Sequence, residues 1–352
     1  MFFDKFEEIY DFSNIENPKK LNEIPLSVLD TVPVLEGETV KDAFNNMISL
    51  AKHAEKLGYN RYWLAEHHNM PGIASSATSV AIGYVAANTE KIRVGSGGVM
   101  LPNHSSLVIA EQFGSLDAMY PNRIDLGLGR APGSDQNTAF ALRGDTRNQG
   151  QNFPSQLEEL RRYFDGTSLN NVRATPGEGS NLPIWLLGSS DFSARLAAKL
   201  GLPFSFASHF SDDNTIYALR AYRDNFMPSK DLDKPYVILG LNVFAADTTE
   251  EAYRLSTSHQ QLFVDLMRNK PRKLQPPVDT MDGIWTAHEE AVLKRQLKST
   301  IIGNPEEVKV QLQEFISRTQ ADELIITSAI YDQKARLRSY EILAEIAELN
   351  KI

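Results

Sequence analysis

Residues 24–66 read IPLSVLDTVPVLEGETVKDAFNNMISLAKHAEKLGYNRYWLAE, and this stretch decides the fold class. It begins with a short apolar run, IPLSVLD, which predicts a β-strand. A helix follows, because Thr39 and Asp42 have the spacing of a capping box and apolar residues then recur every three or four positions. Gly58 stands where a left-handed C-cap belongs, and the run RYWLAE behind it predicts a second strand. The stretch is therefore one strand–helix–strand unit.

The same alternation continues along the chain. Six further strands are expected at residues 92–95, 124–128, 183–187, 203–207, 236–245 and 323–327. Helical patterns lie between them, at residues 76–88, 107–119, 155–164, 192–200, 215–225 and 250–266, with two more beginning near residues 305 and 333. About eight strands that alternate with helices favour a closed parallel (β/α)8 barrel, the TIM barrel, over an open doubly wound sheet.

Two connections are too long for simple loops. Residues 131–153, after the fourth expected strand, are rich in Asn and Gly, and residues 268–282, after the seventh, form a basic stretch that contains proline. We interpret them as insertions after strands 4 and 7, because the chain shows no internal repeat and no low-complexity linker. The prediction is a single domain over residues 1–352, with a short N-terminal extension over residues 1–23.

Composition and charge exclude several classes of protein. A chain with 42% hydrophobic and 23% charged residues is an ordinary globular one. Its net charge of −9 gives no general footprint for nucleic acid or an anionic membrane surface. No apolar run approaches the roughly 18 residues of a membrane span, and the acidic N-terminus does not resemble a signal peptide, so a cytoplasmic location is expected. Because cysteine is absent, disulfides, thiolate catalysis and Cys-bound metals are excluded.

A histidine pair follows the second expected strand. In barrels of this class the active site is built from the carboxyl ends of the strands, so His67 and His68 are candidates for chemistry. A surface or supporting pair is one interpretation, and metal ligation is another. The remaining histidines, at positions 53, 104, 209, 259 and 288, form no spaced ligand motif with carboxylates, so no metal site is predicted.

Three further strand ends carry residues that suit a phosphorylated cofactor. Gly97 and Gly98 leave the backbone bare after the third strand, where something flat or bulky would approach it. Gly129 and Arg130 follow the fourth strand, and an arginine there would clamp a phosphate or a carboxylate. The helix start after the fifth strand, which would hold a phosphate with N–H groups and hydroxyls, contains Gly188, Ser189, Ser190 and Ser193. Taken singly these motifs also fit a bulge or a plain N-cap, but together they indicate a phosphate-bearing cofactor.

Four motifs, in this order, resemble those of the bacterial luciferase-like flavin-dependent monooxygenases, and the similarity is closest to the non-luminescent group 1 branch. The motifs are AEHHNMP at 65–71, GSGGVMLP at 95–102, AEQF at 110–113 and RIDLGLGRAPG at 123–133. The resemblance implies a (β/α)8 barrel, usually a homodimer, that binds reduced FMN at the carboxyl ends of its strands.

The resemblance also implies roles for single residues. Arg130 matches the arginine that binds the flavin phosphate, and Ser190 and Ser193 match hydroxyls that contact it. The pair Gly97-Gly98 matches a position where the family often has a non-proline cis peptide under the flavin ring. His67 matches a catalytic histidine.

Two further residues receive less defined expectations. Ser27, taken to lie past the first strand, is expected to line the site near the flavin ring. His68 is expected either to orient His67 or to face the phosphate.

The function implied is that of a monooxygenase that takes reduced FMN from a separate flavin reductase and oxygenates a small organic substrate with O2. No NAD(P)H fingerprint is present in the sequence. Gly129 stands where luciferase has a reactive cysteine, so light emission is not implied. The alternatives are an F420-dependent hydride-transfer oxidoreductase, a non-catalytic flavin-binding protein, and a metal-dependent hydrolase that uses the His pair.

Overall fold

The structure of the chain is a computed structural model. It describes residues 18–131, 135–143, 152–167, 171–210 and 214–349. Most of the expected N-terminal extension therefore lies outside the described residues. Its last part forms the short 3-10 helix η1 (Leu21–Glu23), in which Leu21 is buried.

Eight parallel strands form a closed barrel, as predicted. In chain order they are β1 (Leu26–Asp30), β2 (Arg61–Leu64), β3 (Arg93–Ser96), β5 (Ile124–Gly129), β6 (Ile184–Gly188), β7 (Phe204–Phe206), β8 (Val237–Ala245) and β10 (Glu323–Thr327). Each strand pairs with the next in this order, and β10 pairs in parallel with both β8 and β1, which closes the barrel. All strands therefore end at the same side of the barrel.

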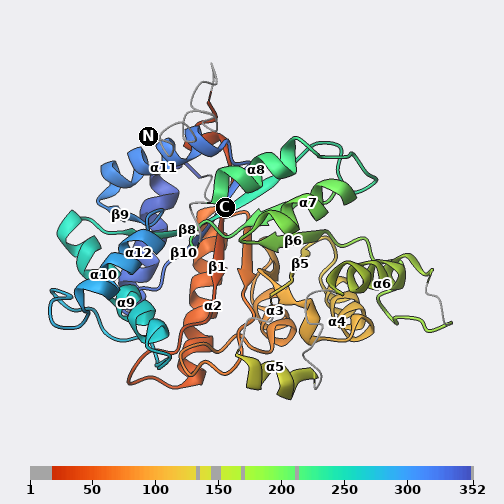
Figure 1. Ribbon diagram of the computed structural model, residues 1–352, viewed down its shortest axis with the longest axis horizontal. Coiled ribbons are helices and arrows are strands. Elements are labelled where there is room, and N and C mark those ends of the chain that lie inside the picture. The colour runs from red at the N-terminus through yellow and green to blue at the C-terminus, as the bar shows by residue number, and fades with distance from the viewer. Residues whose placement is uncertain (1–17, 132–134, 144–151, 168–170, 211–213, 350–352) are drawn as a thin grey trace.

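Helices surround the barrel and connect successive strands (Figure 1). They are α2 (Val40–Leu57), α3 (Thr78–Ala87), α4 (Ser106–Met119), α6 (Phe153–Asp165), α7 (Asp191–Leu200), α8 (Thr215–Arg223), α9 (Thr249–Met267), α11 (Pro305–Thr319) and α12 (Gln333–Ile346). Their apolar faces and the outward-facing strand residues form one continuous hydrophobic core between the barrel and the helices.

Helix α2 illustrates how local sequence sets these elements. Thr39 and Asp42 form the predicted capping box, in which each side chain accepts a hydrogen bond from the backbone N–H of the other residue. Gly58 ends the helix in the left-handed conformation, with φ of 84°. The helix therefore begins and ends where the sequence pattern predicts.

The two insertions follow the fourth and seventh barrel strands. The first contains α5 (Gln136–Arg143). The second, residues 268–282, contains no helix and is followed by α10 (Ala287–Gln296) and β9 (Ile301–Gly303). The strand β9 pairs with the carboxyl half of β8 and lies outside the closed barrel. A further short strand, β4 (Val99–Met100), pairs with the end of β5 and leads into the 3-10 helix η2 (Leu101–Asn103). The elements β4, β9 and η2 were not expected from the sequence, since two or three residues are too few to show a hydrophobic period.

A buried ionic network closes the amino end of the barrel. Arg61 donates two hydrogen bonds to Glu323, at 2.7 and 2.9 Å, and one to Asp125 at 2.7 Å. Burial alone would lower the pKa of Arg61, but the two carboxylates raise it above its ordinary value. Tyr236 also donates to Glu323, at 2.9 Å. The arginine is therefore a permanently charged, fully paired group.

Ser27 belongs to this network, which corrects the expectation that it lines the site. It lies inside β1 rather than past it, and its hydroxyl donates to Glu323 and accepts the backbone N–H of Arg61. The error arose because side chains near the start of a strand lie at the opposite end of the barrel from the active-site loops.

The described helices offer no membrane span, because none of them is both long enough and apolar enough to cross a bilayer.

Candidate active site

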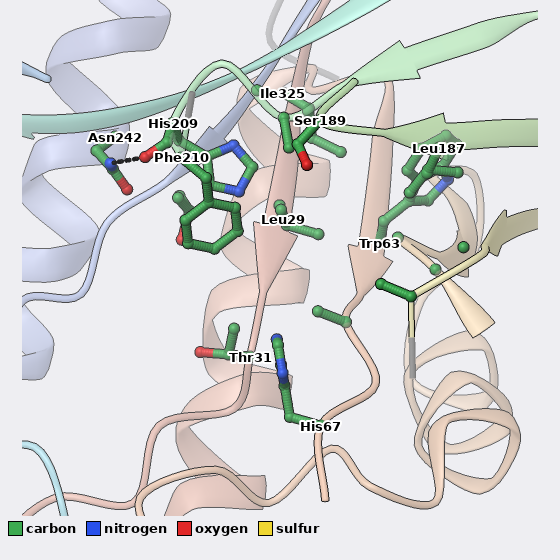
Figure 2. Close-up of a pocket in the computed structure, with 18 of the residues that line it drawn as sticks. Leu29, Thr31, Trp63, His67, Leu187, Ser189, His209, Phe210, Asn242 and Ile325 are labelled. Atoms are coloured by element: carbon green, nitrogen blue, oxygen red, sulfur yellow. Dashed lines mark hydrogen bonds between the residues drawn. The ribbon is translucent and has the colours of Figure 1, made fainter. Parts of the chain in front are cut away.

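A cavity of about 400 Å³ opens at the carboxyl ends of the barrel strands. Its wall includes Leu29 and Trp63 from the barrel interior, together with residues of the loops that follow β2, β3, β5, β6 and β7. Figure 2 shows His67 on the loop after β2 and His209 with Phe210 on the loop after β7, at separate parts of the wall. The position matches that of active sites in this class of barrel.

The cavity brings together all the cofactor-binding candidates except Ser27. The predicted residues that line it are Gly97, Gly98, Gly129, Arg130, Gly188, Ser189, Ser190 and Ser193. The Gly97–Gly98 peptide bond is cis. Residues more than 90 positions apart in the sequence therefore form one side of the cavity, which we call the glycine side.

Arg130 is a cation without a carboxylate partner within the described residues. Its guanidinium lies 4.2 Å from the centre of the Phe192 ring, a cation–π contact that orients the side chain. Because it lines the cavity, its charge is available to a bound anion.

The start of α7 lies beside Arg130 and is also open to an anion. Ser190 is the N-cap residue, but its side chain caps no backbone N–H group. Ser193, in the first turn, is buried and lines the cavity. The carboxylate of Asp191 is held by Arg195 at 2.9 Å. The first-turn N–H groups therefore need a partner that the helix does not supply, as at known anion sites.

The two adjacent histidines have different surroundings. His67 lines the cavity. His68 is absent from the described lining and bonds through Nε2 to Glu66 Oε1 at 2.7 Å. His68 therefore has a carboxylate partner, and its role toward the phosphate or toward His67 stays a prediction.

Glu66 connects two loops of the site. It accepts hydrogen bonds from His104 Nε2 at 2.8 Å, from His68 Nε2 at 2.7 Å and from the Met100 N–H at 3.0 Å. Burial alone would raise the pKa of Glu66, but the bonds from His104 and His68 outweigh it and hold this pKa below its ordinary value. The carboxylate thereby ties the loop that carries His67 to the segment that follows Gly98.

Glu66, His68 and His104 also form a group that could hold a metal ion, which their sequence spacing did not reveal. Ligand atoms around a tetrahedral zinc ion lie about 3.3 Å apart, given metal–ligand distances of about 2.0–2.2 Å. The nitrogen–oxygen distances here are 2.7 to 2.9 Å, which are those of direct hydrogen bonds. As the group stands, it is a hydrogen-bonded anchor.

The remaining part of the cavity wall was not anticipated from the sequence. One region of it contains His209, Phe210, His259, Phe263 and Leu266, from the loop after β7 and from α9. His209 closely follows a strand, so a search of the residues after each strand would have found it. His259 lies in the middle of a helix, where the sequence gives no such signal. We call this part the histidine side.

Comparison with known proteins places the chain in a family. The family model described as luciferase-like monooxygenase matches residues 26–323. A luciferase-like monooxygenase of Escherichia coli (strain K12) is 51% identical over 326 residues, which cover 92% of this chain and 97% of that protein. An N-acetyl-S-alkylcysteine monooxygenase of Bacillus subtilis (strain 168) is 35% identical over 329 residues, covering 92% of this chain and 98% of the relative.

A solved structure supports the same assignment. Apo-MsnO8 superimposes with a TM-score of 0.84 at 36% identity, covering 94% of this chain and all of that one. Sequence and fold agree over nearly the whole length. The chain belongs to the luciferase-like monooxygenase family.

Proposed function

We propose that the protein is a flavin-dependent monooxygenase that receives reduced FMN from a separate flavin reductase and uses O2 to oxygenate a small organic substrate. The observation that carries the proposal is Arg130, which has no carboxylate partner among the described residues and lies beside the open start of α7, in a cavity lined by glycine backbone and apolar side chains. This combination suits a molecule with a phosphate at one end and a flat ring at the other.

The residues of the cavity fit FMN in three respects. Arg130 and the first-turn N–H groups of α7 match the charge and the acceptors of a phosphate. Gly97 and Gly98 leave a stretch of the wall free of side chains, which suits a flat ring system. The buried surfaces of Leu29 and Trp63 provide apolar contact.

When bound, reduced FMN supplies the electrons that activate O2. The chain contributes binding, orientation and exclusion of water. Arg130 holds the phosphate and so fixes the position of the ring, and the apolar wall keeps solvent away. His67 holds or moves a proton at its imidazole ring, which exchanges protons near neutral pH. Glu66 holds the loop that carries His67 in place through its hydrogen bonds to Met100 and His104.

We also propose that the protein is a homodimer that associates through α3 and α4. Val80 and Tyr84 on α3, and Val108 and Met119 on α4, are large apolar side chains that are exposed in the single chain, Val80 to 72%. The two helices are neighbours. Helix α3 contains no charged residue, and a helix that is apolar on all sides is normally covered on all sides.

The phosphate assignment is tested by comparing FMN with riboflavin, which lacks the phosphate. Arg130→Ala should weaken FMN binding by roughly 10- to 150-fold, the equivalent of about 1.5–3 kcal/mol for hydrogen bonds to a charged group, and should leave riboflavin binding nearly unchanged. Fluorescence quenching gives both dissociation constants. Arg161→Ala is the control, because Arg161 pairs with Asp231 outside the cavity lining. Equal losses for FMN and riboflavin would place the phosphate elsewhere.

Turnover distinguishes the alternatives. Parallel titration with FMN and F420 identifies the cofactor class, and O2 uptake after anaerobic loading with reduced FMN separates a monooxygenase from a protein that only binds flavin. Thioethers belong in the substrate panel because a relative bears the name N-acetyl-S-alkylcysteine monooxygenase. Binding of F420 in preference to FMN would overturn the proposal.

A further inference from the structure

The histidine side of the cavity contains polar atoms without partners. Both ring nitrogens of His259 and Nδ1 of His209 are buried and have no hydrogen-bond partner within the described residues. Both residues line the cavity, and each is only 6% exposed. A buried polar atom that lacks a partner costs about 1–3 kcal/mol, so such atoms at a cavity wall indicate a ligand that completes them.

Burial keeps the two imidazoles uncharged at neutral pH. Burial lowers the pKa of His259 to about 3, and the nearby His209 acts in the same direction. Burial also lowers the pKa of His209 to about 4; the Gly240 backbone opposes this, and His67 reinforces it. The ring of His259 lies against Phe244 and Phe263, with centroid distances of 5.3 and 4.8 Å, so its surroundings are apolar. Each neutral ring offers one N–H donor and one acceptor nitrogen.

The described part of the cavity wall offers one side-chain cation to an anionic group. Among the described residues that line it, Arg130 is the sole arginine or lysine, and no aspartate or glutamate is present. Once a cofactor phosphate occupies Arg130, a substrate carboxylate would be buried without a counter-charge. Burying an unpaired charge is far less favourable than burying a neutral group that can form hydrogen bonds.

We propose that His209 and His259 bind an uncharged polar group of the substrate, so that the enzyme selects neutral, largely apolar molecules that carry a carbonyl, amide or hydroxyl group. Phe210, Phe263 and Leu266 supply the apolar surface beside this polar group. The inference rests on the proposed function, because it requires that the cofactor phosphate and not the substrate occupies Arg130.

The experiment measures binding and needs no turnover. Hexanamide and hexanoate have the same chain length and nearly the same shape, and they differ in charge. In FMN-saturated protein at pH 7.5, hexanamide should bind at least tenfold more tightly than hexanoate by calorimetry. It should also shift the ¹⁵N signals of His209 and His259 in histidine-labelled protein. Equal affinities, or unchanged histidine signals at millimolar hexanamide, would overturn the proposal.

Substitutions test which residue is responsible. His259→Phe keeps an aromatic ring and removes both nitrogens, so hexanamide affinity should fall about tenfold, as for the loss of one buried hydrogen bond. Its melting temperature should stay level or rise, because the unpaired nitrogens of the ligand-free protein are gone. His53→Phe is the matched control, since His53 lies beside Glu341 outside the cavity lining. Unchanged hexanamide affinity in His259→Phe would remove His259 from the subsite.

The two proposals fail separately. Retained hexanamide preference without flavin-dependent O2 uptake would refute the monooxygenase alone. Loss of the preference with FMN binding intact would refute the histidine subsite alone.

Discussion

Acid should destabilise this protein through His209 and His259 well before its carboxylates are protonated. An unfolded histidine has a pKa of about 6.5, whereas the folded-state pKa is about 4 for His209 and about 3 for His259. Below pH 6.5 the unfolded chain therefore binds protons that the folded chain does not bind. Since the folded pKa values are the lower ones, the free energy of unfolding falls as the pH falls, and keeps falling until each folded pKa is reached.

The size of the effect follows from the same values. Each such histidine reduces the free energy of unfolding by about 1.4 kcal/mol per pH unit below 6.5, which gives about 2–3 kcal/mol at pH 4.5. The pair then accounts for roughly 5 kcal/mol, a large share of the 5–15 kcal/mol that typically holds a protein folded. His259→Phe removes one of the two contributions.

Urea unfolding followed by circular dichroism at pH 7.0 and pH 4.5, at constant ionic strength, measures this difference. The stability of His259→Phe relative to the wild type should improve by about 2–3 kcal/mol between the two pH values. His288→Phe, on an exposed position of α10, is the control and should follow the wild type. A difference between His259→Phe and wild type that is the same at both pH values would refute the reasoning.

Three further predictions concern other parts of the molecule. Arg61→Met leaves the buried Glu323 without its cation, while Asp125 keeps Arg93, and should lower the free energy of unfolding by about 3–5 kcal/mol in urea titrations; a loss below about 1 kcal/mol would contradict this account of the network. Gly98→Ala would place a Cβ atom 2.7 Å from the carbonyl oxygen of Gly127 and should lower the melting temperature. The control Gly83→Ala, whose Cβ would meet only a leucine methyl at 3.3 Å inside a helix, should not lower it. Val80→Lys should convert a dimer to a monomer in analytical ultracentrifugation, whereas a monomeric wild type would contradict the proposed interface.

The sequence predicted the architecture because the signals for it are local. The capping residues Thr39 and Gly58 mark both ends of α2, and short apolar runs mark the barrel strands. The glycine side was also predictable, since strand ends meet at one edge of a parallel barrel, and Arg130 stands directly after such an end.

The parts that sequence reasoning missed depend on contacts between distant segments. Ser27 was placed at the wrong end of the barrel, because the exact start of a strand decides which end a residue occupies. His68 was expected to act with His67 or with the phosphate, but its hydrogen-bond partner is Glu66, two positions away. His104, from another loop, bonds to the same carboxylate. His259 was passed over, because a histidine on an apolar helix face has the same pattern whether it packs in a core or borders a cavity.

The ionic network at the amino end of the barrel has a kinetic consequence. Arg61, Asp125 and Glu323 close that end, and Trp63 and Trp185 pack above them inside the barrel. Every molecule that reaches the cavity must therefore enter and leave through the carboxyl end. When two ligands share one entrance, the one that binds deeper has to arrive first and depart last, so the closed floor of the barrel imposes an order on binding and release.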